Sequence, residues 1–126
     1  MPTIIIADDD DQLRTMLSQI FEVENYTVIE AQNGQQAIDY IRNNTVDLLI
    51  TDLIMPEKEG IETINELKRV SPELPIFAMS GGSMTNSEVY LQIAQKLGVS
   101  QTFLKPFDIN EMLEAVKLIL PQQVES

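Results

Sequence analysis

The chain has 126 residues, a length that suits one compact domain with a buried core. Eight basic residues against twenty acidic ones give a formal charge of −12, which opposes binding to nucleic acid or to an anionic membrane surface. Cysteine and histidine are absent, which excludes disulfides, thiolate zinc sites, thiol nucleophiles and any serine–histidine relay.

Short apolar runs alternate with amphipathic stretches from the start of the chain. Residues 3–7 are a β-branched run that predicts a strand. The helical spacing that follows predicts an amphipathic helix with its apolar stripe at Leu13, Met16, Leu17, Ile20 and Phe21. Residues 26–30 predict a weaker strand, and Asn33 with Gly34 begins a second helix.

The same alternation continues through the middle of the chain. Residues 46–51 predict a buried strand, and Pro56 with Gly60 separates it from the next helix. That third helix has its apolar stripe at Ile61, Ile64, Leu67 and Val70. Residues 75–79 predict a fourth strand.

The last third adds two helices and one strand. The fourth helix, which ends at Gly98, has its predicted stripe at Val89, Ile93, Ala94 and Leu97. Residues 102–104 predict a fifth strand, and Asp108 can cap a final helix that ends at Pro121. The apolar stripe of that helix is Met112, Leu113, Val116, Ile119 and Leu120.

Five strand–helix units in series predict an α/β fold, a doubly wound five-stranded parallel sheet with helices on both faces. We expect one domain over residues 1–121 and a C-terminal tail over residues 122–126. The chain has neither a long apolar run nor a signal peptide, so we expect a cytoplasmic protein with no membrane segment.

Polar side chains follow four of the predicted strands. Four aspartates at residues 8–11 follow the first strand, Asp52 the third, Ser80 the fourth and Lys105 the fifth. Strand ends that precede helices all meet at one edge of a parallel sheet, where ligands bind. We therefore expect carboxylates, a hydroxyl and an ammonium group to converge there.

Each of these groups has an ordinary explanation when it is taken alone. Aspartates at a helix start cap free N–H groups and complement the helix dipole, and we interpret Asp10 and Asp11 in this way. Asp52, Ser80 and Lys105 could each be a plain loop residue. The functional hypothesis therefore rests on all of them falling at the same edge.

A carboxylate cluster without histidine or cysteine favours a hard cation such as Mg²⁺, because clustered carboxylates repel one another unless a cation is present. With a cation bound, an aspartate can attack phosphorus and form an acyl phosphate. Such a transfer depends on positioning and charge neutralisation, so it needs no histidine base in this chain.

Four segments carry a resemblance to a known family. They are IIIADD at 4–9, LLITDLIMP at 48–56, PIFAMS at 75–80 and FLKPF at 103–107. Together they resemble the response-regulator receiver domain of two-component signalling, the family of the chemotaxis response regulator, over about residues 3–120. The resemblance implies a flavodoxin-like sheet with strand order 2-1-3-4-5.

The resemblance also implies roles for individual residues. Asp52 matches the phosphoacceptor, and Ser80 and Lys105 match the residues that hold phosphoryl oxygens. Asp8, Asp9 and Asp52 match the carboxylates around Mg²⁺, and the backbone carbonyl of Ile54 matches another ligand. The Lys105–Pro106 bond matches one that is commonly cis in the family.

One position departs from the family pattern. Thr102 stands three residues before the lysine, where the family usually has Tyr or Phe. Phe103 should point to the other face of the strand, so it does not replace the missing ring. How the signal leaves the domain is therefore open.

The implied function is that of a signalling phosphoacceptor, not an enzyme acting on other substrates. Its partners would be a sensor histidine kinase or a histidine phosphotransfer protein, and a downstream protein target or output domain. The chain has no basic helix-turn-helix, so we expect no direct nucleic-acid contact and no membrane partner.

Three alternatives remain open at this point. One is an aspartate-nucleophile phosphatase of haloacid-dehalogenase type, although its Asp-x-Asp-x-Thr or Val motif is not matched at residues 8–13. A flavin binder of flavodoxin type would need a hydroxyl-rich phosphate loop in place of the four aspartates. The third is a receiver cut from a larger regulator.

Overall fold

A computed structural model describes residues 1–54, 60–81 and 87–120. Within these ranges five strands alternate with five helices, and the strand boundaries differ from the predicted ones by at most two residues. The elements are β1 (Thr3–Ala7), α1 (Asp11–Val23), β2 (Thr27–Ala31), α2 (Gly34–Asn43), β3 (Leu48–Asp52), α3 (Gly60–Val70), β4 (Ile76–Gly81), α4 (Ser87–Lys96), β5 (Gln101–Lys105) and α5 (Ile109–Ile119). The predicted breaks at Pro56 and Pro121, and the tail over 122–126, lie outside the described residues.

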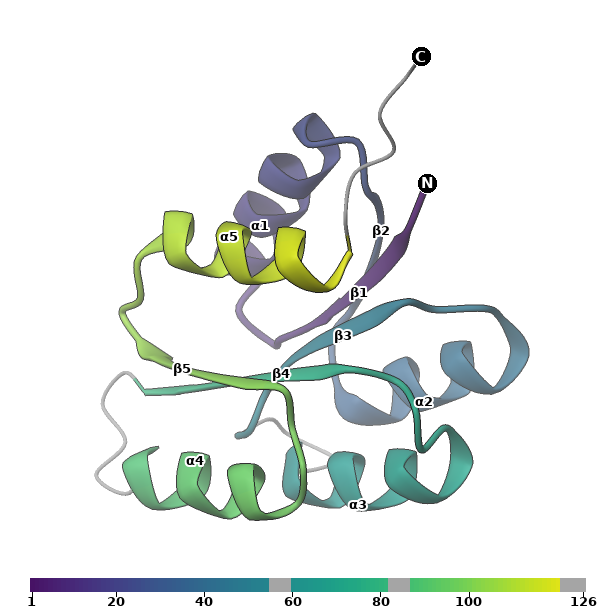
Figure 1. The fold of residues 1–126 in the computed structure, drawn as a ribbon, viewed down its shortest axis with the longest axis vertical. Coiled ribbons are helices and arrows are strands. Elements are labelled where there is room, and N and C mark those ends of the chain that lie inside the picture. Colours follow the sequence, from purple (N-terminus) through teal and green to yellow (C-terminus); the bar gives the residue numbers. More distant parts are fainter. Residues whose placement is uncertain (55–59, 82–86, 121–126) are drawn as a thin grey trace.

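The strands form one parallel sheet in the order β2-β1-β3-β4-β5. Helices α1 and α5 cover one face of this sheet, and α2, α3 and α4 cover the other (Figure 1). The predicted doubly wound α/β fold and its strand order are therefore confirmed. No helix in the described ranges is long and apolar enough to cross a membrane.

Two apolar cores lie on the two faces of the sheet, because alternate residues of each strand point to opposite sides. Ile4 and Ile6 of β1 join the core under α1 and α5, with Leu17 and Met112 from those helices. Ile5 of β1 joins the core under α2, α3 and α4. The central strands β1 and β3 are buried on both faces, which explains their nearly continuous apolar sequences.

Three of the predicted helix stripes need correction. On α3, Val70 is 38% exposed, whereas Ile64 and Leu67 are buried as predicted. On α1, Met16 is 40% exposed, and the buried stripe is Arg14, Leu17, Ser18 and Phe21. On α4, Val89 and Ile93 are 53% and 39% exposed, whereas Leu91 and Ala94 are buried. Helix α4 has apolar residues on two faces, and the face that packs against the sheet carries Leu91 and Ala94, with Tyr90 and Leu97 beside them.

The predicted helix ends are confirmed where the structure describes them. Asp10, Asn33 and Asp108 cap α1, α2 and α5, each accepting backbone N–H groups with its side chain. Gly98 follows α4 with a φ of 96°, the left-handed backbone that glycine adopts most easily.

Candidate functional site

The predicted polar residues meet at the carboxyl ends of the parallel strands. Asp8 directly follows β1, Asp52 ends β3, Ser80 is the fifth residue of β4, and Lys105 ends β5. Strand register brings these ends level, with Gly81 beside Lys105 on the neighbouring strand. We call the ends of β1, β3, β4 and β5, with Asp9, the acidic edge.

Three carboxylates of the acidic edge form one cluster. Carboxylate oxygens of Asp8, Asp9 and Asp52 all lie within 4.8 Å of one another. Asp8 is fully buried, Asp52 is 7% exposed, and Asp9 is exposed to solvent. Oxygen donors of this kind fit a hard divalent cation such as Mg²⁺, which binds one or two carboxylates and keeps water in its remaining positions.

Lys105 is the cation that the fold places against this cluster. Its Nζ donates to Asp8 Oδ2 at 2.9 Å and lies 3.6 Å from Asp52 Oδ1. Burial alone would lower the pKa of Lys105, but the hydrogen bond that it donates to Asp8 and the charge of Asp52 outweigh burial and raise it. The ammonium group therefore stays charged and balances part of the carboxylate charge.

Two backbone features lie next to Lys105: the peptide bond to Pro106, which the sequence predicted to be cis, and Gly81 on the neighbouring strand β4, whose conformation was not predicted. The Lys105–Pro106 bond is cis, as expected. Gly81 has a φ of 149°, and a Cβ atom there would lie 2.7 Å from the Lys105 carbonyl oxygen. Only glycine allows β4 to approach β5 this closely beside the site.

The pKa of the Asp52 carboxyl is strongly raised. Burial raises its pKa to about 7, Lys105 opposes this rise, and the charges of Asp8 and Asp9 add to it. A bound cation would favour the ionised form. Asp52 thus combines a buried position with a need for positive charge nearby.

Ser80 is fully buried, and its Oγ has no hydrogen-bond partner among the described residues. A buried hydroxyl without a partner carries a desolvation cost. Such a group at the acidic edge is free to donate to an incoming anion. Ile54, two residues after Asp52, is partly buried and packs against the core under α2 and α3.

Thr102 lies on β5 with its side chain on the α4 side. Its Oγ1 accepts a hydrogen bond of 3.2 Å from Gln95 Nε2 of α4. Phe103 points to the opposite face, as predicted, and its ring lies 5.6 Å from Phe77 and 5.8 Å from Phe107.

Sequence reasoning missed Arg14, which touches the backbone of the acidic edge. Its Nη1 donates to the Asp8 carbonyl oxygen at 2.6 Å, and its other nitrogens bind Asp11 and Glu30. One signal was present: Arg14 lies three residues before Leu17 and seven before Phe21, which places a charge on the buried stripe. The interpretation of Asp10 and Asp11 as ordinary residues of a helix start is confirmed, because Asp10 caps α1 and Asp11 lies in its first turn; the ion pair between Asp11 and Arg14 was not predicted.

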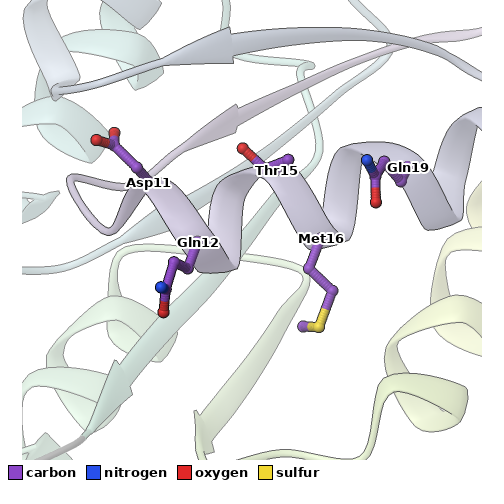
Figure 2. Close-up of a pocket in the computed structure, with 5 residues that line it drawn as sticks. All are labelled: Asp11, Gln12, Thr15, Met16 and Gln19. Atoms are coloured by element: carbon purple, nitrogen blue, oxygen red, sulfur yellow. The ribbon is translucent and has the colours of Figure 1, made fainter.

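Two surface features flank the acidic edge. A pocket of about 350 Å³ lies between α1 and the start of α5, and Asp10, Met16 and Lys105 are among its lining residues. A more open depression lies along α1 (Figure 2), lined by Asp11, Gln12, Thr15, Met16 and Gln19. Both expose side chains of α1, among them Met16.

A family model for the response regulator receiver domain matches residues 4–117. The chain belongs to this family. It is a receiver domain of two-component response regulators, and the interpretations as a haloacid-dehalogenase-type phosphatase or a flavin binder are set aside. The fold and the order of its strands agree with this assignment.

Two curated relatives show how such domains occur in longer and shorter proteins. Sporulation initiation phosphotransferase F of Bacillus subtilis (strain 168) is 33% identical over 118 residues, which cover 94% of this chain and 93% of the relative. The transcriptional regulatory protein CpxR of Escherichia coli (strain K12) is 32% identical over 120 residues, which cover 95% of this chain but 50% of CpxR.

Solved structures share the whole fold. A response regulator receiver protein from Pseudomonas putida has a TM-score of 0.83 at 26% identity, covering 93% of this chain and 96% of its own. The response regulator protein TrrA from Thermotoga maritima, solved in complex with Mg²⁺ and BeF, has a TM-score of 0.80 at 26% identity, covering 95% of this chain and all of its own.

Proposed function

We propose that Asp52 is the phosphoacceptor of this receiver domain and that Mg²⁺ binds beside it during transfer. Asp8, Asp9 and Asp52, with the backbone carbonyl of Ile54, would hold the cation. The phosphoryl donor is a phosphohistidine of a sensor histidine kinase or of a histidine phosphotransfer protein. The phosphorylated domain then changes conformation and acts on a downstream protein or on an output domain.

The observation that carries this proposal is the position of Asp52. Its carboxylate is nearly buried, lies within 4.8 Å of two other carboxylates and is 3.6 Å from Lys105 Nζ. In the transfer, an Asp52 oxygen forms a bond to phosphorus while the bond from phosphorus to the donor's imidazole nitrogen breaks. The imidazole nitrogen keeps the electron pair of that bond, and the product is an aspartyl phosphate.

Positive charge is what this reaction requires from its surroundings. Without a cation, the Asp52 carboxyl, with its pKa of about 7, is only partly ionised at neutral pH. Bound Mg²⁺ would keep this carboxylate ionised and neutralise charge on the phosphoryl oxygens. The oxygen-only donor set and the Mg²⁺ complex of the related TrrA support this cation.

Lys105 and Ser80 would hold the transferred group. Lys105 Nζ already lies between Asp8 and Asp52, so a small movement brings it to a phosphoryl oxygen on Asp52. The Ser80 hydroxyl, which has no partner in the described ranges, would donate to another oxygen. Drawing this hydroxyl inward would shift the end of β4 and provide the conformational signal.

The domain is proposed to catalyse only its own phosphorylation and dephosphorylation. Its downstream partner is either a separate protein or an output domain on the same polypeptide, since the match covers 93% of one relative and 50% of another. We propose residues 1–121 as the folding unit of the receiver.

The test is mass spectrometry after exposure to a small phosphodonor, such as acetyl phosphate, with and without Mg²⁺. We expect one added phosphoryl group on Asp52, formed only with the divalent cation. Asp52→Asn should abolish labelling. Asp108→Asn is the matched control, because Asn caps the start of α5 as well as Asp does and lies outside the carboxylate cluster. Labelling of Asp52→Asn at another residue would overturn the assignment.

A further inference from the structure

Arg14 holds together three segments that meet behind the acidic edge. Its side chain is 8% exposed, and its guanidinium has one partner on each of its three nitrogens. Nη1 donates to the Asp8 carbonyl oxygen at 2.6 Å, Nη2 to Asp11 Oδ1 at 2.5 Å, and Nε to Glu30 Oε1 at 3.0 Å. The three partners belong to the β1–α1 connection, the first turn of α1 and strand β2.

These bonds fix the backbone on which two of the clustered carboxylates stand. Asp8 is also held by its N–H, which donates to the Ala31 carbonyl oxygen at 3.1 Å. Its Oδ1 accepts from the Asp10 N–H at 2.9 Å. The Arg14 bond to the Asp8 carbonyl oxygen therefore restrains the peptide that joins Asp8 to Asp9, and the Ala31 bond restrains the peptide before it. Asp11, meanwhile, is paired with Arg14 instead of joining the cluster.

We propose that Arg14 is a positioning residue that makes the acidic edge selective for Mg²⁺ over Ca²⁺. This inference rests on the proposed function, because it concerns the same cation. Mg²⁺ requires near-ideal octahedral geometry at about 2.0–2.1 Å, whereas Ca²⁺ accepts 6–8 oxygens at about 2.3–2.6 Å in flexible arrangements. A rigid Asp8–Asp9 backbone therefore favours the smaller ion, and a loosened backbone removes that preference.

The charge of Arg14 and its positioning of the Asp8 backbone have opposite effects on the affinity for Mg²⁺. A guanidinium near the carboxylates repels any divalent cation, so its charge alone would weaken binding of Mg²⁺ and Ca²⁺ alike. A positioning effect must therefore come from the planar guanidinium, whose nitrogens reach three partners at once. Lysine keeps the charge but has a single ammonium nitrogen in place of that planar group. Arg14→Lys separates the two effects.

The experiment is isothermal titration of Mg²⁺ and, separately, of Ca²⁺ into the metal-free full chain. The variants are Arg14→Lys, Glu30→Ala and the control Arg42→Lys. Arg42 lies on α2, on the other face of the sheet, and forms a half-exposed ion pair with Glu66 at 3.0 Å. Circular dichroism at the titration temperature checks that each variant is folded. Glu30→Ala loosens the Arg14 side chain while leaving its charge in place.

Arg14→Lys should bind Mg²⁺ about tenfold more weakly, as expected when a group that orients a metal ligand is removed. Its Ca²⁺ affinity should fall by about threefold at most, so the preference for Mg²⁺ shrinks. Glu30→Ala should reduce the preference in the same direction by a smaller factor, and Arg42→Lys should leave it unchanged.

Equal losses for both ions in Arg14→Lys, or no loss for either, would overturn the inference and leave the proposed function intact. Should Arg14→Lys fail to fold, an unchanged preference in Glu30→Ala would overturn it. Absence of Mg²⁺ binding by the wild-type chain would overturn the proposed function, and the inference with it.

Discussion

On the β1–α1 side of the acidic edge, the polar groups around Asp8 form hydrogen bonds with one another. On the β4 side, the buried Ser80 hydroxyl has no hydrogen-bond partner among the described residues. Arg14, Asp10 and Lys105 all bond to Asp8. Beyond Ser80, helix α4 is tied to β5 by the exposed bond between Gln95 and Thr102.

This difference in hydrogen bonding suggests different roles for the β1–α1 side and the β4 side of the acidic edge. Phosphoryl transfer depends on carboxylates and a cation held in fixed positions, so the β1–α1 side is built from mutually satisfied charges. A switch needs a group whose bonding changes between two states, and under the proposed function the hydroxyl of Ser80 would be such a group. The predictions below test whether this division is correct.

The largest expected effect concerns the stability of the metal-free protein. The raised pKa of Asp52 means that the folded protein binds this proton more tightly than the unfolded chain does. The Asp52 contribution to the free energy of unfolding therefore falls as pH rises from about 4 to about 7, and stays low above it. In EDTA at pH 8, Asp52→Asn should be more stable than the wild type by roughly 3 kcal/mol.

Urea unfolding from pH 4 to pH 8 measures this difference. Asp39→Asn, on the surface of α2, is the control for removing one negative charge. A difference between Asp52→Asn and the wild type that does not grow with pH would contradict the burial of an ionised carboxylate at the acidic edge.

The second effect is the stabilisation by Mg²⁺. A cation that binds only the folded state adds about 2.7 kcal/mol at a hundred times its dissociation constant. Asp9→Asn should lose most of this gain because it removes a clustered carboxylate. Asp10→Asn should keep it, since Asn at the N-cap of α1 still accepts the Gln12 and Leu13 N–H groups.

Thermal unfolding with and without millimolar Mg²⁺ measures both variants. An unchanged melting temperature of the wild type in Mg²⁺ would mean that the carboxylate cluster holds no cation. Equal responses of Asp9→Asn and Asp10→Asn would mean that total charge, and not the cluster, determines binding.

Much of this site could be predicted from sequence because strand order alone brings strand ends together. Asp52 and Lys105 could be predicted from their places at the ends of β3 and β5, and Asp10 from its capping position. Arg14 was missed because its partners include Glu30 and the Asp8 backbone, which meet only when α1 packs beside β2. The helical periodicity of α1 predicted a buried stripe of apolar residues alone, and a buried arginine does not fit that pattern.

The stripe of α4 was predicted only in part, for a related reason. Ala94 and Leu97 pack in the core as predicted, but Val89 and Ile93 are exposed and Leu91 is buried in their place. Periodicity identifies an apolar face, and packing against β4 and β5 decides which apolar residues of α4 are buried. The lack of a hydrogen-bond partner for Ser80 among the described residues is likewise a property of the assembled strands and not of any local motif.

The third effect compares two buried serines on the two sides. Ser18 Oγ donates to the Arg14 carbonyl oxygen at 2.8 Å, whereas Ser80 Oγ has no partner in the described ranges. Ser18→Ala should lower the free energy of unfolding by about 0.5–1 kcal/mol, since the better helix propensity of Ala offsets part of the lost bond. Ser80→Ala should leave it unchanged or raise it by about 1 kcal/mol.

Denaturant unfolding of the metal-free protein measures both serine variants. In the presence of Mg²⁺ and a beryllofluoride mimic of the phosphoryl group, the order should reverse, because Ser80 then has an anion to bind and Ser18 does not gain one. A loss of stability in metal-free Ser80→Ala equal to that of Ser18→Ala would contradict the division between the two sides.

The smallest effect concerns Thr102, the position at which the sequence analysis finds a departure from the family pattern. Thr102→Val keeps the β-branched shape and removes the acceptor for Gln95. Because this hydrogen bond is exposed, we expect the free energy of unfolding to fall by about 0.5 kcal/mol or less.

Thr102 has a side chain too small to fill the space that Ser80 would leave on activation. Activation should therefore alter the end of β4 and α4 more than it alters β5. NMR shift changes on adding beryllofluoride, in the wild type and in Thr102→Tyr, measure this distribution. Wild-type changes centred on β5, with the same pattern in Thr102→Tyr, would show that the signal does not depend on the size of residue 102.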